Sequence, residues 1–308
     1  MAAGTRGVVV ICKDRVVIVT GAGRGLGRAH ALALAEAGAC VVVNDLGASL
    51  RGDGTDEGPA VEVAAEITAR GGRAIAHAGD ITDWAVGAEL VALAVETWGE
   101  LHAVVNNAGI VRDRMFVSSE AAEWEAVLKV HVMGHVATTR HACAHWRQRA
   151  KEGRTVDARI VNTTSGAGLQ GSIGQAAYST AKGGIASLTL VQAAELARYG
   201  VTANAIAPAA RTRMTEEVFA EAMRAPEEGF DAMDPANVSP LVTWLCSEAS
   251  RAVSGRVFEV QGGRIALSDG WRELPGASRD ARWSPEELSD IVPALLAAAP
   301  TPPKVYGT

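Results

Sequence analysis

Short runs of β-branched and other apolar residues alternate along the chain with longer, alanine-rich stretches of helical periodicity. The apolar runs are predicted strands, at residues 15–20, 40–44, 74–77, 103–106, 159–162, 201–206 and 257–260. The stretches between them are predicted helices, at residues 27–37, 59–70, 86–97, 119–149, 175–199 and 240–247. Strands that are apolar along almost their whole length, each followed by a helix, are typical of a parallel sheet with helices on both faces.

The alternation predicts a single α/β domain over residues 1–263, with a Rossmann-type, doubly wound parallel sheet as the middle of three α/β/α layers. Right-handed crossovers then place a ligand crevice at the carboxyl ends of the strands. Residues 264–308 are expected to form a C-terminal extension that packs on this domain or on a neighbouring subunit. A helix in that extension is predicted to begin at Pro285, after the N-cap residue Ser284.

The composition excludes several classes of protein. Of the 308 residues, 48% are hydrophobic and 21% are charged, which is enough apolar surface for a folded core. Lysine and arginine number 29 against 35 acidic residues, so the net charge of −6 makes nucleic acid and anionic membranes poor electrostatic partners. The sequence has no uncharged apolar run of the ~18 residues that a membrane span needs, and its four cysteines are too scattered for a metal or redox motif. We therefore expect a cytoplasmic protein that binds neither a membrane nor a metal.

A glycine-rich turn follows the first predicted strand. It consists of Gly21, Ala22, Gly23, Arg24, Gly25, Leu26 and Gly27, and it leads directly into a predicted helix. Glycines allow a sharp turn and let backbone N–H groups approach a pyrophosphate at the helix N-terminus. Such a turn also occurs without a ligand, and this GxxxGxG spacing differs from the GxGxxG fingerprint. Its position in the first strand-to-helix connection favours a nucleotide site.

Polar residues at the ends of the next strands complete the predicted nucleotide site. Asp45 follows the second strand, where a carboxylate can accept hydrogen bonds from an adenosine ribose and repel a 2′-phosphate. We therefore expect NAD rather than NADP, although Arg24 argues in the opposite direction because it could pair with that phosphate. The third and fourth strands lead to Asp80-Ile81 and to Asn106-Asn107-Ala108-Gly109, which suit an adenine edge and the floor beneath a ribose.

Ser165, Tyr178 and Lys182 form the candidate catalytic set. Tyr178 and Lys182 are four residues apart in a predicted helix, so they lie on one face, and Ser165 follows the fifth strand. A free tyrosine ionises near ~10, and a nearby ammonium should lower that pKa by stabilising the phenolate. Tyr178 could then exchange a proton with a substrate oxygen, held by Ser165, while a hydride moves to or from a nicotinamide. A tyrosine–lysine pair alone is usually a surface pair; the accompanying nucleotide motifs favour catalysis here.

Together these motifs resemble those of the short-chain dehydrogenase/reductase family. The matching segments are TGAGRGLG (20–27), Asp80, NNAG (106–109), Ser165, YSTAK (178–182) and NAIAP (204–208), within residues 13–263. The resemblance implies a Rossmann fold and a Ser–Tyr–Lys site in which Lys182 also contacts the nicotinamide ribose. It also implies that Asn107, Pro208 and Thr212 line the cofactor. A homodimer or homotetramer, with residues 119–149 and 175–199 at its interface, is a further implication of the resemblance.

One position departs from the family pattern in a way that concerns the chemistry. Where the family often has an asparagine that orders a water of the proton relay, this chain has His131. A histidine can also hold a water or a carbonyl group. His131 is therefore either a relay residue or a packed helical histidine.

A closer resemblance is to the (3R)-hydroxyacyl-CoA dehydrogenase part of peroxisomal multifunctional enzymes and to bacterial 3-oxoacyl reductase-like proteins. It rests on NDLG (44–47), NNAGIVRDRMF (106–116), GQAAYSTAK (174–182), RMTE (213–216) and SPLVTWLCSE (239–248). This resemblance implies an NAD-dependent oxidoreductase that interconverts a secondary alcohol and a ketone. Its small-molecule substrate would be a 3-hydroxyacyl or 3-oxoacyl thioester, such as an acyl-CoA.

Two alternatives to that function remain open on the sequence. Only the substrate loops would separate a thioester dehydrogenase from a steroid or other alicyclic alcohol dehydrogenase. The alternative of another class is a non-catalytic nucleotide-binding regulator, against which the intact catalytic set argues. Residues 211–237 mix apolar and charged positions, so we expect either a helical lid over the substrate pocket or a helix packed on the core.

Overall fold

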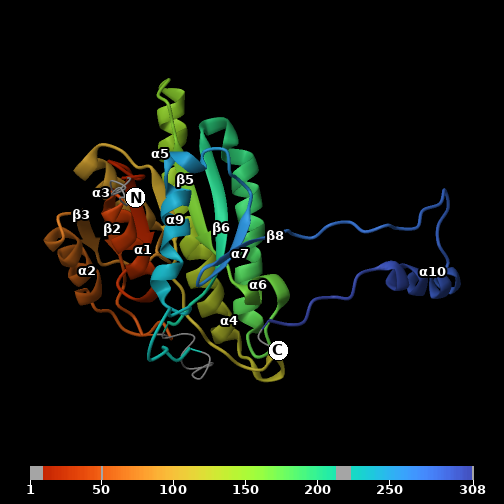
Figure 1. Ribbon diagram of the computed structural model, residues 1–308. Coiled ribbons are helices and arrows are strands. Elements are labelled where there is room, and N and C mark those ends of the chain that lie inside the picture. The colour runs from red at the N-terminus through yellow and green to blue at the C-terminus, as the bar shows by residue number, and fades with distance from the viewer. Residues whose placement is uncertain (1–9, 50, 213–222, 307–308) are drawn as a thin grey trace, which may run out of the picture.

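The computed structural model describes residues 10–49, 51–212 and 223–306, and these residues include one eight-stranded sheet (Figure 1). The strands are β1 (Val16–Thr20), β2 (Cys40–Asn44), β3 (Arg73–His77), β4 (Ala103–Asn106), β5 (Ala158–Thr163), β6 (Val201–Ala209), β7 (Val257–Gln261) and β8 (Arg264–Ser268). Their order is β3-β2-β1-β4-β5-β6-β7-β8, and every neighbouring pair is parallel except β7 and β8. The strand order reverses between β1 and β4, where doubly wound sheets bind their ligands.

Helices cover both faces of this sheet. They are α1 (Gly25–Glu36), α2 (Gly58–Ala69), α3 (Trp84–Trp98), α4 (Ala121–Leu128), α5 (Gly134–Lys151), α6 (Gly166–Gln170), α7 (Ala176–Leu196), α9 (Ser239–Cys246) and α10 (Pro285–Ala298). Helices α1, α2 and α9 contribute to the apolar cluster on one face, and α3 and α5 to the cluster on the other, where α7 also packs. This arrangement confirms the predicted three-layer, doubly wound fold.

Strand β1 shows why the predicted strands are apolar along their whole length. All five of its residues are buried. Val17 and Val19 belong to the cluster beneath α1, α2 and α9, whereas Val16 and Ile18 belong to the opposite cluster beneath α3 and α5. Successive side chains of a strand point to opposite faces, so a strand covered on both faces needs an apolar side chain at each position. Each such side chain contributes about 1.5–3 kcal/mol on burial.

The predicted helix at residues 119–149 is divided into three parts. Helix α4 ends at Leu128, a π-helical turn occupies Lys129–Met133, and α5 begins at Gly134. His131 lies in the π-helical turn and is buried. The sequence pattern did not predict this turn, because apolar residues recur at helical spacing straight through it. Single π-helical turns within α-helices are frequent at functional sites.

The start of the C-terminal extension belongs to the sheet. Residues 264–268 form β8, which pairs antiparallel with β7 after a tight turn in which Gly262 has a φ of 52°. Ile265 and Leu267 alternate with more polar residues, as in an edge strand, and both are exposed. This strand was not predicted because its alternation covers only five residues.

Beyond β8 the chain projects away from the domain, carries α10, and returns so that its C-terminal end lies beside α6 (Figure 1). Helix α10 begins at Pro285 after Ser284, as predicted, and the Ser284 and Glu287 side chains form a capping box. In the described part of the chain, no helix has both the length and the apolar character that a membrane crossing requires.

Helix α1 carries a histidine that is fully buried against α9. The Nδ1 atom of His30 lies 2.9 Å from the hydroxyl oxygen of Ser239. Burial lowers the pKa of His30 from its ordinary value of 6.5 to about 3. The folded protein therefore keeps this ring neutral at a pH where the unfolded chain binds a proton.

This difference predicts an acid-dependent loss of stability. As the pH falls below 6.5, His30 binds a proton in the unfolded state but not in the folded state. The free energy of unfolding therefore declines until the pH reaches about 3. Between pH 7 and pH 5 the loss should amount to about 2 kcal/mol from this histidine. Urea unfolding of the wild type and of His30→Gln at both pH values measures it. The variant should show a smaller difference between the two pH values, and an equal difference would contradict the assignment.

Candidate active site

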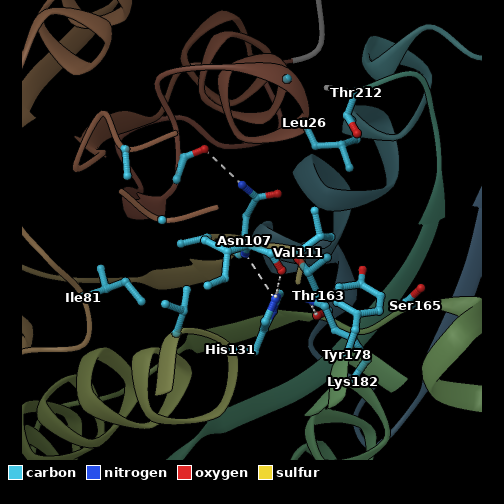
Figure 2. Close-up of a pocket in the computed structure, with 18 of the residues that line it drawn as sticks. Leu26, Ile81, Asn107, Val111, His131, Thr163, Ser165, Tyr178, Lys182 and Thr212 are labelled. Carbon is cyan, nitrogen blue, oxygen red and sulfur yellow. Dashed lines mark hydrogen bonds between the residues drawn. The ribbon is translucent and has the colours of Figure 1, made fainter. Parts of the chain in front are cut away.

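A cavity of about 450 Å³ lies at the carboxyl ends of the parallel strands. Its walls come from the turn between β1 and α1, the loops after β2, β3, β4 and β6, the end of β5, and α7. Figure 2 shows side chains from these elements converging on it. The predicted site residues that line it are Gly21, Arg24, Gly25, Leu26, Asp45, Asp80, Ile81, Asn107, Ala108, Gly109, His131, Ser165, Tyr178, Lys182, Pro208 and Thr212. Gly27 is the one predicted site residue that is not part of the wall.

Asn107 holds the glycine-rich turn in place. Its side-chain Nδ2 donates to the carbonyl oxygens of Thr20 and Gly21, at 3.1 Å each, and its backbone N–H donates to the Thr20 hydroxyl at 3.0 Å. Gly27 lies directly beneath this contact, because a Cβ there would come within 2.1 Å of the Gly21 oxygen and 2.5 Å of Asn107 Nδ2. Gly27 therefore shapes the turn from behind, and Asn107 fixes the turn as well as lining the cavity.

Asp45 is held in the cavity wall by two backbone groups. Its Oδ2 accepts from the Gly23 N–H and its Oδ1 from the Gly47 N–H, each at 2.7 Å. The guanidinium of Arg24 lies 3.8 Å from the Asp56 carboxylate. The carboxylate of Asp45 thus has a fixed position in the cavity wall, whereas Arg24 has an acidic neighbour of its own.

Two further predicted residues, Asp80 and Ile81, lie after β3. The carboxylate of Asp80 accepts from the Thr82 N–H at 2.9 Å and so shapes its own loop. Ile81 is buried and packs against Gly134, where a Cβ would come within 1.8 Å of its Cδ1. Helix α5 can begin this close to the loop only because residue 134 has no side chain.

Ser165, Tyr178 and Lys182 meet at the other end of the cavity (Figure 2). Ser165 is the N-cap of α6, and its hydroxyl oxygen accepts from the Ala167 N–H at 3.2 Å. Lys182 donates from Nζ to the Thr163 carbonyl oxygen at 2.7 Å, and Nζ lies 5.7 Å from the centre of the Tyr178 ring. The predicted i, i+4 spacing therefore does place the phenol and the amine on one face of α7.

The electrostatics of this set differ from the prediction. Burial raises the pKa of Tyr178 to about 12, against the opposite effect of its hydrogen bond with Ser165. Burial also lowers the pKa of Lys182 to about 7. The pKa of Tyr178 therefore lies above that of a free tyrosine, in the direction opposite to the shift expected from a nearby ammonium. Burial disfavours the charged form of both groups.

His131 lies beside the same residues. Its ring packs edge-to-face on Tyr178 with the ring centres 5.3 Å apart, and its Nε2 is 2.7 Å from the Ile110 carbonyl oxygen. Gly109 leaves the room for it, since a Cβ there would come within 2.4 Å of His131 Cε1. Burial and the nearby Lys182 hold the pKa of His131 well below its ordinary value. The ring is therefore neutral at physiological pH.

The residues around the cavity fit a dinucleotide with a nicotinamide ring. At one end the N-terminus of α1 and the glycine turn offer backbone N–H groups to a diphosphate. At the other end Thr163 Oγ1 and His131 Nδ1 are buried polar atoms with no hydrogen-bond partner among the described residues. Unpaired buried atoms of this kind in a cavity wall are explained by a bound molecule or water.

Several lining residues were not predicted from the sequence. The loop after β2 contributes Ser49, Arg51 and Gly52 to the wall, and Tyr306 at the C-terminal end contributes its ring. The length and polarity of the loop after β2 could have indicated that Ser49, Arg51 and Gly52 belong to the site. No comparable feature of the sequence pointed to Tyr306.

The proposed lid at residues 211–237 is only partly described. Residues 213–222, including the RMTE segment, lie outside the described residues. Met223 lines the cavity, and the Arg211 N–H donates to the Met233 carbonyl oxygen at 2.6 Å. The two ends of this segment therefore lie close together at the cavity.

Comparisons with known proteins agree with this geometry. A chain from Mycobacterium tuberculosis named hydroxyacyl-CoA dehydrogenase ChsB1 is 47% identical over 278 residues, which are 89% of this chain and 86% of that one. Peroxisomal multifunctional enzyme type 2 of Mus musculus is 41% identical over 90% of this chain, but the match spans only 36% of that enzyme. A crystal structure of a short-chain dehydrogenase from Mycobacterium avium is 56% identical, with a TM-score of 0.88 over 97% of this chain and 100% of that chain.

The sequence profile of one family covers most of the domain. The profile described as short chain dehydrogenase matches residues 15–222, from the start of β1 to the segment after β6. Members of this family are oxidoreductases that act on CH–OH groups with a nicotinamide cofactor. The profile and these relatives place the chain, as the sequence motifs indicated, in the short-chain dehydrogenase/reductase family.

Proposed function

We propose that this protein interconverts a secondary alcohol and a ketone on 3-hydroxyacyl and 3-oxoacyl thioesters, with NAD as its cofactor. The main support for the proposal is the arrangement of residues in the cavity. Ser165, Tyr178 and Lys182 lie at one end of it, while the glycine-rich turn and Asp45 lie at the other. A dinucleotide that spans the cavity would therefore bring its nicotinamide to the two hydroxyl groups.

The thioester substrate is supported by the relatives rather than by a particular pocket residue. The Mycobacterium tuberculosis protein is named a hydroxyacyl-CoA dehydrogenase and is similar over nearly its whole length. The cavity has apolar walls at Val111, Ala210 and Met223, which suit a hydrocarbon chain. A steroid or other alicyclic alcohol would suit the same walls, and it is the second candidate substrate class.

The proposed chemistry assigns a task to each hydroxyl. The Ser165 hydroxyl accepts from the Ala167 N–H and makes a hydrogen bond with Tyr178, so the two hydroxyls lie close enough together to share a substrate oxygen. Tyr178 keeps its proton at neutral pH because its pKa is about 12, and a protonated phenol is the form that reduction of a ketone needs. Lys182, with a pKa of about 7, can accept or supply a proton near neutral pH. These intact groups also argue against a non-catalytic regulator.

The cofactor would be held along the whole cavity, by residues of its wall and by Gly27, which shapes the glycine-rich turn from behind, and it would supply or accept the hydride. We assign that role to Gly21, Arg24, Gly25, Leu26, Gly27, Asp45, Asp80, Ile81, Asn107, Ala108, Gly109, Tyr178, Lys182, Pro208 and Thr212. The fixed carboxylate of Asp45 favours NAD, because it would accept from ribose hydroxyls and repel a 2′-phosphate. The sequence left open that Arg24 binds the 2′-phosphate of NADP. The structure makes this role weaker, because the Arg24 guanidinium lies near the Asp56 carboxylate, which would repel a phosphate.

His131 is proposed to take part in the proton relay. Its Nε2 lies against the Ile110 carbonyl oxygen, which leaves the buried Nδ1 without a partner among the described residues. A neutral ring with one free nitrogen can hold a water next to Lys182. The alternative, a packed helical histidine, would leave that nitrogen unsatisfied at a cost.

We also propose a homodimer or homotetramer located in the cytoplasm. The interface helices would be those at residues 119–149 and 175–199. Met133, Leu190 and Val191 on these helices expose about half of their side-chain surface, at 46%, 50% and 48%. Exposed aliphatic side chains on long helices are common at subunit interfaces.

The role of Tyr178 is tested with Tyr178→Phe. The phenylalanine ring keeps the packing but has no proton to exchange, so NADH should bind as before while kcat falls by about 10²–10⁴-fold. Oxidation of NADH by acetoacetyl-CoA measures kcat, and NADH fluorescence measures Kd. Tyr199→Phe, in the short 3-10 turn after the end of the same helix, is the matched control and should keep full activity. A near-normal kcat for Tyr178→Phe would show that another group transfers the proton.

The role of Asp45 is tested through the choice of cofactor. The wild type should have the higher kcat/KM with NADH. Asp45→Asn keeps one of the two oxygens that accept from loop N–H groups and removes the charge that repels a 2′-phosphate, so the ratio of the two kcat/KM values should fall by about tenfold or more. Asp45→Ala removes both acceptor oxygens and should weaken the loop further. A wild-type preference for NADPH would overturn the assignment and make Arg24 a phosphate-binding residue.

A further inference from the structure

The C-terminal end of the chain reaches the substrate end of the cavity. The Tyr306 N–H donates to the Gly171 carbonyl oxygen at 2.9 Å, directly after α6. Its ring is half-buried and lines the same cavity as Ser165 and Tyr178. Figure 1 shows the C-terminal end of the chain beside α6, after the excursion that carries α10. A residue remote from the family motifs therefore forms part of the wall near the reacting groups.

The Tyr306 ring occupies the space that the absent side chain of Gly166 leaves. A Cβ on Gly166 would come within 2.3 Å of Tyr306 Cε2 and 2.4 Å of its Cδ2. The backbone of Gly166 does not have the positive φ that requires a glycine. Alanine at position 166 is thus compatible with the first turn of α6, and its main effect is to displace the ring. Since Gly166 follows Ser165 directly, the ring lies one residue from the hydroxyl assigned to the substrate oxygen.

The two tryptophans of the extension do not share this position. Trp271 is fully exposed, and Trp283 is stacked by the Arg279 guanidinium at 4.2 Å from its ring centre. Neither lines the cavity. Of the aromatic residues of the extension, Tyr306 is thus the one that lines the cavity together with Ser165 and Tyr178.

We propose that Tyr306 is a specificity-determining residue, whose ring closes the substrate end of the cavity and limits the size of the group on the reacting carbon. The inference deepens the proposed function, because it rests on Ser165 and Tyr178 holding the substrate oxygen. The extension from residue 264 is then part of the substrate site of its own domain. With the ring in place, a small group packs against it; without the ring, a larger group fits.

The test compares two thioesters that differ only at the reacting carbon. Acetoacetyl-CoA carries a methyl group there and benzoylacetyl-CoA a phenyl group. Tyr306→Ala should raise the ratio of kcat/KM for the phenyl substrate over the methyl substrate by about tenfold or more, through KM rather than kcat. Tyr306→Phe should keep the wild-type ratio because it keeps the ring. The NADH Kd and the thermal midpoint should be unchanged in both variants.

Gly166→Ala supplies an independent check. If its Cβ acts by displacing the ring, it should change the ratio as Tyr306→Ala does, and the double variant should match Tyr306→Ala alone. Gly184→Ala, where a Cβ would meet no atom within 4 Å, is the matched control and should behave as wild type. An unchanged ratio in Tyr306→Ala, or effects of the two substitutions that simply add, would overturn the proposal.

If the proposed function is wrong, the same experiment gives a result that differs from failure of the Tyr306 proposal. A wild type that reduces neither thioester would show that the substrate class is wrong. The same variants are then compared on acetone and acetophenone, which also differ by a methyl against a phenyl group on the reacting carbon. A rise in the ratio of kcat/KM for the phenyl ketone over the methyl ketone in Tyr306→Ala would support the role of Tyr306, and an unchanged ratio would overturn it. Absence of turnover with all four compounds would overturn both proposals.

Discussion

The hydrogen bond from the buried amine of Lys182 to the Thr163 carbonyl oxygen, 2.7 Å long, holds the two parts of the reaction site together. Thr163 ends β5 and Lys182 lies in α7, and a second bond joins the Thr164 hydroxyl to the Lys182 carbonyl oxygen at 2.6 Å. Ser165 comes next in the chain, and Tyr178 lies one turn before Lys182. The two bonds therefore fix where the serine and tyrosine hydroxyls meet. Burying an amine has a cost, which is visible in the lowered pKa of Lys182, about 7.

A chain of buried amides supports this contact from within the core. Asn106, at the end of β4, donates to Asn162 Oδ1 at 2.9 Å and to the Thr139 hydroxyl at 2.7 Å. Asn162 in β5 donates in turn to the Thr189 hydroxyl and to Gln192 Oε1, at 2.9 and 2.8 Å. The network joins two central strands to α5 and α7. Because each of these bonds requires a defined geometry, it sets the position of α7, and so of the catalytic face, more specifically than apolar packing does.

The sequence predicted those parts of the site that a single element specifies. The glycine-rich turn, Asp45 and the spacing of Tyr178 and Lys182 are set by local backbone geometry, so they could be found without the fold. The π-helical turn that positions His131 and the ring of Tyr306 depend on contacts between distant segments. The raised pKa of Tyr178 was missed for the same reason, since its cause is burial by several elements at once. Most strands and helices were predicted because their apolar residues repeat with a clear period, whereas β8 was too short for that.

The energy of the Tyr306 contact is consistent with a wall that opens for substrate exchange. One amide hydrogen bond contributes about 1 kcal/mol, and partial burial of an aromatic ring about 1–3 kcal/mol. The segment between Ser268 and Tyr306 contains α10 and is otherwise irregular, and closing a loop of this length costs about 3–4 kcal/mol. The gain and the cost are similar, so the ring should occupy its place against Gly166 without being fixed there. A substrate that packs against the ring would then shift this balance toward the closed cavity, which links the distant C-terminal end to substrate binding.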